Sequence, residues 1–189
     1  MGYLSFLLFL TIGVIVFGLS SIQYVSAQAQ QTKLTFVPYS NPTLGIQMNI
    51  PVGWHDISGH SDSILLRAPL ESFGGGGEGE HVILGIDFHA LPSMQNTLDA
   101  LTKYQLADDN PKKDKDIIQH GPTMLGGLPA YMITKNNVYF EGNFDWRQME
   151  IWTIKGSNWY DVLYLAEGDK YEQYLPIVNQ IIKSLKFTT

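Results

Sequence analysis

One short stretch of the chain carries four side chains that can bind a metal ion or transfer a proton. His55, Asp56, His60 and Asp62 lie within eight residues of one another. Imidazole nitrogens and carboxylate oxygens together suit Zn²⁺ or Mn²⁺. The spacing matches no established zinc motif, and Gly59 favours a loop, so a solvated surface loop is the alternative interpretation.

The same stretch contains the three residue types of a hydrolytic triad. Ser58, His60 and Asp62 supply a hydroxyl, an imidazole and a carboxylate. A triad is defined by its spatial arrangement, so closeness along the chain gives it no support. The chain also has no Gly-x-Ser-x-Gly nucleophile elbow. We therefore predict no catalytic residue. The alternative functions are a secreted hydrolase or metal-dependent enzyme that uses His55, His60 and Asp62, and a metal-binding or metal-delivery protein.

A second acid and imidazole are expected to share one face of a strand. Asp87 and His89 are two positions apart, and side chains at i and i+2 of a strand point to the same side. Because strands of this domain are expected to be covered on both sides, a satisfied structural pair is favoured over an acid–base pair.

Two further segments suggest ligand binding only weakly. Gly74–Gly79 is rich in glycine, but it precedes a strand and no Gly-Lys-Ser/Thr follows, so a surface loop is favoured over a phosphate loop. The segment 108–116 alternates acids with lysines but lacks the glycine and closing glutamate of an EF-hand. We predict no cofactor and assign no metal ligand, and leave weak binding of Ca, Mn or Zn open.

Aromatic residues gather around Gly142. Tyr139, Phe140, Phe144 and Trp146 flank it, and tyrosine and tryptophan are enriched at the hot spots of protein interfaces. A hairpin tip that binds a partner is one interpretation, and packing in the core or at a sheet edge is the other.

The N-terminal residues 1–27 have the pattern of an export segment. No charged side chain precedes Lys33, Leu4–Leu19 is almost continuously apolar, and a small-x-small sequence ends at Ala27. This pattern predicts a cleaved signal peptide or, if it is retained, a membrane anchor. We therefore expect a secreted or cell-surface, extracytoplasmic protein, with a polar tether over residues 28–35.

The composition limits the class of protein. The 189 residues include 12 basic and 18 acidic side chains, for a net charge of −6, and no cysteine. The chain therefore lacks the basic footprint of a nucleic-acid-binding protein. Disulfides, cysteine-ligated metals and a thiol nucleophile are excluded.

Hydrophobic periodicity and turn residues predict one globular domain over residues 36–187. The expected strands are 36–37, 45–50, 63–68 and 81–91, followed by the hairpins 117–125/128–135 around Gly126-Gly127 and 144–155/158–166 around Gly156-Ser157.

Two helices are expected besides these strands. Asn96 is expected to cap a helix over 97–108, and apolar residues at helical spacing from Tyr171 to Leu185 predict a terminal helix that Pro176 kinks or delays. Hairpins imply a largely antiparallel sheet, and with helices on its faces the fold class is a layered α+β domain.

This order of elements resembles the PsbP family, extrinsic subunits of the oxygen-evolving complex and their relatives. The resemblance rests on Tyr39-x-Asn41-Pro42-x-x-Gly45 with Pro51-x-x-Trp54, the Thr97-Leu98 helix start, Gly126-Gly127-x-Pro129-Ala130-Tyr131, and Trp152-Thr153-Ile154 with Trp159-Tyr160 running into the terminal helix. It implies a central antiparallel sheet sandwiched between helices in α/β/α layers.

The resemblance also implies a location and a type of activity. Family members are extrinsic proteins on the outer or lumenal side of a membrane, and some are linked to calcium or manganese handling. The apolar export segment and the lack of a basic N-terminal arm make the chain similar to secreted prokaryotic relatives. We expect a non-catalytic binding or accessory protein at the outer face of a membrane, with a membrane protein complex or a small ligand as its partner.

Overall fold

The computed structural model describes residues 34–59, 62–69, 82–108, 116–138 and 146–188. The chain divides into two compact units, Met1–Lys33 and Leu34–Thr189, and the described residues all belong to the second. The export segment predicted over 1–27 lies outside the described residues. Within them, no helix has both the length and the apolar character needed to span a bilayer.

This unit consists mainly of strands, and its two helices lie between strands along the chain. The described elements are β1 (Phe36–Asn41), β2 (Ile46–Pro51), β3 (His55–Asp56), β4 (Ser63–Arg67), β5 (Val82–Ala90), α1 (Leu98–Asp108), β6 (Asp116–Leu125), β7 (Leu128–Val138), β8 (Trp146–Lys155), β9 (Asn158–Glu167), α2 (Gly168–Ser184) and β10 (Lys186–Phe187).

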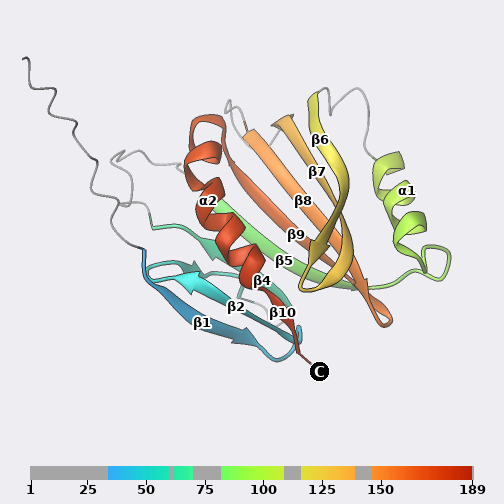
Figure 1. Ribbon diagram of the computed structural model, residues 1–189, viewed down its shortest axis with the longest axis horizontal. Coiled ribbons are helices and arrows are strands. Elements are labelled where there is room, and N and C mark those ends of the chain that lie inside the picture. Colours follow the sequence, from blue (N-terminus) through green and yellow to red (C-terminus); the bar gives the residue numbers. More distant parts are fainter. Residues whose placement is uncertain (1–33, 60–61, 70–81, 109–115, 139–145, 189) are drawn as a thin grey trace, which may run out of the picture. The chain divides into compact units, whose positions relative to one another are not determined.

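The strands form two sheets, and every neighbouring pair in them is antiparallel (Figure 1). The larger sheet has the order β3-β4-β5-β9-β8-β7-β6, and the smaller has the order β1-β2-β10. The largely antiparallel sheet predicted from the sequence is confirmed. The first hairpin does not join it but pairs with the end of the chain, where Lys186 lies opposite Gln47 and Phe187 opposite Ile46.

Glycines close the two hairpins as predicted. Gly126 and Gly127 have φ of 58° and 86° between β6 and β7, and Gly156 has φ of 63° between β8 and β9. A two-residue hairpin turn needs such left-handed backbone, which glycine adopts without a Cβ clash. The turn before β2 also contains a left-handed glycine, Gly45 with φ of 63°, and the Asn41 Oδ1 accepts a hydrogen bond from the Leu44 amide at 3.0 Å.

Both helices begin at a different residue from the expected one. Thr97, and not Asn96, caps α1, because its Oγ1 accepts a hydrogen bond from the Ala100 amide at 3.2 Å. Helix α2 begins at Gly168, before the first periodic apolar residue Tyr171, and continues through Pro176 without ending.

The principal core lies between α2, the smaller sheet and one face of the larger sheet. Trp54, which closes the first hairpin, is 6% exposed and lies against Tyr174 of α2 with ring centroids 6.2 Å apart. The core also includes β9, whose Tyr164 is fully buried. Strand β9 lies between β5 and β8 in the middle of the sheet, as its two apolar faces predicted.

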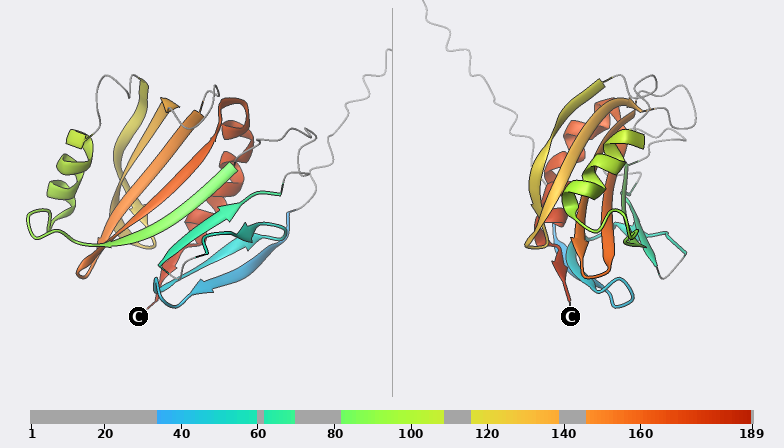
Figure 2. Two further views of the ribbon diagram at one scale, coloured as in Figure 1. Left: turned by 180° about the vertical axis from the view of Figure 1, so that it is seen from behind. Right: turned by 90° about the vertical axis from the view of Figure 1, so that its right-hand side faces the viewer.

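A smaller core forms between α1 and the larger sheet. Leu101 of α1, Ile133 of β7 and Trp152 of β8 form it, and each is 1% exposed. Helix α1 thus contacts β7, whereas α2 contacts β2, β9, β5 and β8. Figure 2 shows the two helices in separate places along the sheet, with α1 towards its β6 end.

Candidate functional site

The residues of the predicted metal site are placed mainly by structural contacts. Asp56 lies in β3, and its carboxylate accepts hydrogen bonds from the Tyr39 hydroxyl at 2.5 Å, the Ser58 hydroxyl at 2.7 Å and the Leu65 amide at 3.3 Å. Partial burial raises the pKa of Asp56, but these hydrogen bonds outweigh it and lower the pKa overall. The carboxylate therefore joins β1, β3 and β4.

The other proposed ligands are not brought together by the described residues. His55 and Asp62 are exposed, and His60 lies outside the described residues. The described part of the chain contains no group of three or more histidines and carboxylates with a geometry that could hold a metal ion. The metal site and the triad through His60 therefore remain predictions.

The remaining sequence candidates differ in how far the structure describes them. Trp146 is 2% exposed, so it packs in the core and is not part of an exposed aromatic tip. The glycine-rich segment, the segment 109–115 and the aromatic residues from Tyr139 to Phe144 lie outside the described residues.

Asp87 and His89 interact electrostatically, and each also meets a residue of β9. The exposed His89 ring lies against Trp159 of β9, with centroids 4.6 Å apart. Asp87 lies directly opposite Asp161 of β9 in the strand register. Burial and the Asp62 carboxylate raise the pKa of Asp87, and nearby His89 opposes the shift.

Asp161 is an unusual side chain for the middle of a central strand. Its Oδ1 is buried, without a hydrogen-bond partner in the described residues. Burial raises the pKa of Asp161 well above its ordinary value, and the charges of Glu150 on β8 and Asp87 on β5 raise it further. Sequence reasoning missed this cluster because its members lie on three strands, although one acid within the apolar run of β9 was the available signal.

We expect Asp161→Asn to remove a dependence of stability on pH. The folded state raises the pKa of Asp161, so it favours the protonated, neutral carboxyl. The contribution of Asp161 to stability is therefore fully present below the unfolded-state pKa of about 3.9 and is lost as the pH rises through the folded-state pKa. The variant should match the wild type in acid and exceed it increasingly towards neutral pH. Denaturant unfolding at several pH values measures this difference. Asp99→Asn, at a 77% exposed carboxylate on α1, is the control for the lost charge, and a parallel profile in both variants would contradict the prediction.

A groove of about 230 Å³ lies between α2 and the β6–β8 part of the larger sheet. We call it the α2 groove. Met132 of β7 and Met149 of β8 form its floor, Leu175 of α2 forms one wall, and Ile118 of β6 the other. Figure 1 shows α2 lying over one part of the sheet, with β6 and β7 beside it and no helix in front of them.

Polar groups surround this apolar floor. Arg147 of β8 forms an ion pair with Glu172 of α2, donates to Asn136 Oδ1 at 2.6 Å and lies over the Tyr171 ring at 5.0 Å. Burial raises the pKa of Tyr171 to about 12, despite a hydrogen bond with Thr134 and the nearby Arg147, so its ring stays neutral. The contacts with Glu172, Asn136 and the Tyr171 ring therefore fix Arg147 at one end of the groove.

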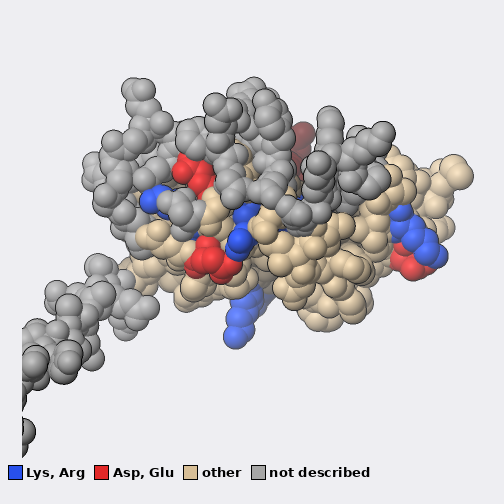
Figure 3. Space-filling view, turned by 90° about the horizontal axis from the view of Figure 1, so that it is seen from above, with Lys and Arg blue, Asp and Glu red and all other residues tan. Residues whose placement is uncertain are grey.

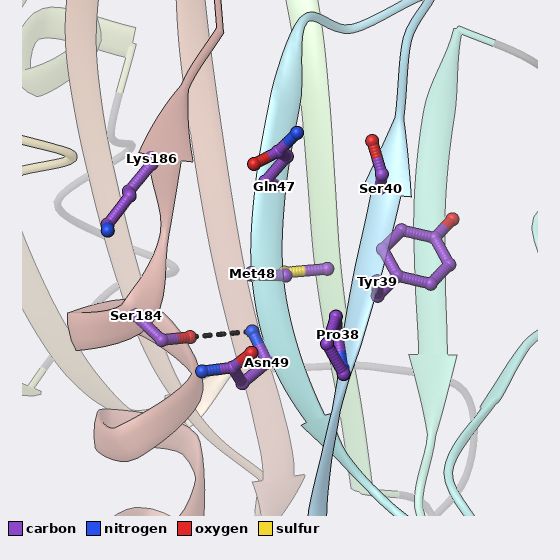
Figure 4. A pocket seen from close by; sticks show the side chains of 8 residues that line it. All are labelled: Pro38, Tyr39, Ser40, Gln47, Met48, Asn49, Ser184 and Lys186. Atoms are coloured by element: carbon purple, nitrogen blue, oxygen red, sulfur yellow. Dashed lines mark hydrogen bonds between the residues drawn. The ribbon is translucent and has the colours of Figure 1, made fainter.

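A second hollow, of about 290 Å³, lies over the smaller sheet, and we call it the β2 hollow (Figure 4). Figure 4 shows its side chains coming from β2, from β1 on one side of it, and from the end of α2 and β10 on the other. Its polar lining consists of Ser40, Gln47, Asn49, Ser184 and Lys186.

Charges on the surface are mixed. On the face shown in Figure 3, the basic and acidic side chains of the described residues lie interspersed and do not form a patch of one sign. This distribution agrees with the net charge of −6 and with the absence of a basic footprint in the sequence.

Comparison with known proteins identifies the fold. No protein-family model matches the sequence, and no curated protein matches it. Among solved structures, cyanobacterial PsbP (CyanoP) from Synechocystis sp. PCC 6803 aligns over 86% of this chain and 98% of its own, with 12% identity and a TM-score of 0.54.

Two other solved structures match to a similar extent. LpqN of Mycobacterium tuberculosis, described as involved in cell envelope biogenesis, aligns over 83% of this chain and 92% of its own, with 11% identity and a TM-score of 0.53. The Saccharomyces cerevisiae Ran-binding protein Mog1p aligns over 82% and 96%, with 6% identity and a TM-score of 0.54. At these identities the likeness concerns the fold alone.

Proposed function

We propose that this chain, whose fold is PsbP-like, is a non-catalytic binding or accessory protein that holds an apolar segment of a partner protein in its α2 groove. The proposal includes the α/β/α layering of the domain and its location at the outer face of a membrane. The location rests on the export pattern of residues 1–27.

The observation that carries the proposal is the composition of the groove. Methionine side chains are flexible and polarisable, and they are used at surfaces that adapt to a partner's side chains. Met132 and Met149 here form a floor beside a fixed Arg147–Glu172 ion pair. An apolar floor with a polar rim is the usual anatomy of a protein interface.

The structural neighbours support a binding role at the level of the fold. One of them is named as a Ran-binding protein, and another is described as involved in building the cell envelope. We extend to this chain only the general expectation that the fold presents surfaces to partner proteins, and the partner itself is not specified by the likeness.

Two adjacent isoleucines provide a matched test of the groove. Ile118 is 51% exposed and lines the groove, whereas Ile117 is 45% exposed, lies opposite Lys135 and is not part of the lining. A photo-crosslinking amino acid at each position of the full chain, activated in intact cells, should give a specific adduct at 118 and none at 117.

The same pair supports a quantitative test. With the cross-linked partner purified, Ile118→Glu should weaken binding by about tenfold or more, because a carboxylate would be buried against the methionine floor. Ile117→Glu should bind like the wild type. Equal cross-linking at both positions, or equal affinities of the two variants, would show that the partner does not use this groove.

A further inference from the structure

The side chains that line the β2 hollow form a regular grid. Gln47 and Asn49 are exposed and alternate along β2, so they share one face and lie about 6.6–6.8 Å apart along the strand. In the register, Gln47 lies between Ser40 of β1 and Lys186 of β10, and Asn49 lies opposite Pro38.

The end of α2 completes the grid beside Asn49. The backbone N–H of Asn49 donates to the Ser184 Oγ at 2.8 Å, and that hydroxyl donates to the Ile181 carbonyl at 2.7 Å. Both hydrogen bonds leave the Asn49 carboxamide group uninvolved, so this side chain is available to the hollow. The first of these bonds nevertheless holds the Asn49 backbone at the end of α2.

The charge of the lining selects a type of ligand. The residues that line the hollow include one lysine and no carboxylate, in a chain whose net charge is −6. An anion is therefore complementary to this surface near Lys186, and a charge-assisted hydrogen bond to lysine is stronger than a neutral one.

The geometry of the sheet further restricts the ligand. Strand β2 is hydrogen-bonded on one side to β1 and on the other to β10. Where it is paired on both sides, its backbone groups are already bonded, so a ligand can contact only its side chains. An extended peptide cannot add to it as a strand. Carboxamide and hydroxyl groups, each able to donate and accept, match a ligand that carries several hydroxyls.

We propose that the β2 hollow binds a small acidic saccharide, whose carboxylate lies at Lys186 and Gln47 and whose hydroxyls bind Asn49 and Ser40. Pro38 provides an apolar surface for the C–H face of a sugar ring. The volume of about 290 Å³ is near the lower end of ligand pockets, about 300–1,000 Å³, so the ligand has one or two rings.

Saturation-transfer NMR on the full chain in mild detergent tests this proposal with three probes. Methyl glucuronide should bind in the millimolar range, and the neutral methyl glucoside should bind about tenfold more weakly, because it lacks the charge-assisted contact. Acetate, an anion without hydroxyls, should not displace the glucuronide at equal concentration.

Variants assign the binding to the hollow. Lys186→Gln should abolish the preference for glucuronide over glucoside, and Asn49→Ala should weaken both sugars. Lys183→Gln, at an exposed lysine of α2 that does not line the hollow, should behave like the wild type. Thermal unfolding of each variant confirms that it is folded. The proposal is overturned if glucuronide fails to bind, if acetate competes equally well, or if Lys186→Gln keeps the preference.

Discussion

Replacing Trp152 by alanine is expected to lower the free energy of unfolding by about 3–5 kcal/mol, the range for a large aromatic residue removed from a core. Trp152 is 1% exposed and joins α1 to the larger sheet through Leu101 and Ile133. Its ring stacks on Tyr131 with centroids 5.4 Å apart, and its Nε1–H donates to Thr102 Oγ1 at 3.0 Å. The variant would lose the packing, the ring contact and the hydrogen bond at one site.

Chemical denaturation monitored by circular dichroism measures this loss. Thr102→Val should cost less, about 1–3 kcal/mol, because it leaves the indole N–H buried without its acceptor but preserves the ring packing. Tyr104→Ala, at a 50% exposed position of α1, is the control for helix surface changes. If Trp152→Ala cost no more than Tyr104→Ala, α1 would not depend on the smaller core.

The second large effect is expected at the turn between β6 and β7 of the larger sheet. Gly126→Ala should destabilise the domain by about 2–5 kcal/mol, as the sum of left-handed backbone strain and overpacking. With φ of 58°, a Cβ at this position would lie 2.6 Å from two carbons of the Phe187 ring and 3.0 Å from Leu185. Either the turn or the Phe187 ring must therefore shift.

A second turn glycine separates the two causes. Gly156 has φ of 63°, and a Cβ there would meet nothing within 4 Å, so Gly156→Ala should show only the backbone strain of about 1–2 kcal/mol. The difference between the two variants in denaturant unfolding measures the contact with Phe187. Equal losses would mean that β10 moves aside without cost.

Local signals in the sequence predicted the larger sheet. Gly126-Gly127 and Gly156-Ser157 placed the hairpins, because left-handed backbone is a property of a single residue and can be read locally. The two apolar faces of β9 placed that strand in the centre of the sheet, because a strand covered on both sides must be apolar on both. Caps were less certain, since Asn96 and Thr97 both suit the first position of a helix and packing selects between them.

Features that depend on distant residues were not predicted. Nothing in Lys186 and Phe187 indicates pairing with β2, because two residues carry no periodicity. The carboxyl cluster around Asp161 arises from the register of β5, β8 and β9. The α2 groove arises because α2 covers only part of one face of the larger sheet. The sequence therefore predicted a binding role, whereas the two hollows to which we assign that role required the structure.

The pairing of β10 with the first hairpin has a consequence for the order of folding. The Asn49–Ser184 hydrogen bond joins residues 135 positions apart, and the Lys186–Gln47 pair is as distant. The smaller sheet therefore stays incomplete until residues 184–187 are available, and contacts of such separation form slowly. A nascent chain would keep β2 open on that side until these residues had been made, about 135 positions after β2 itself.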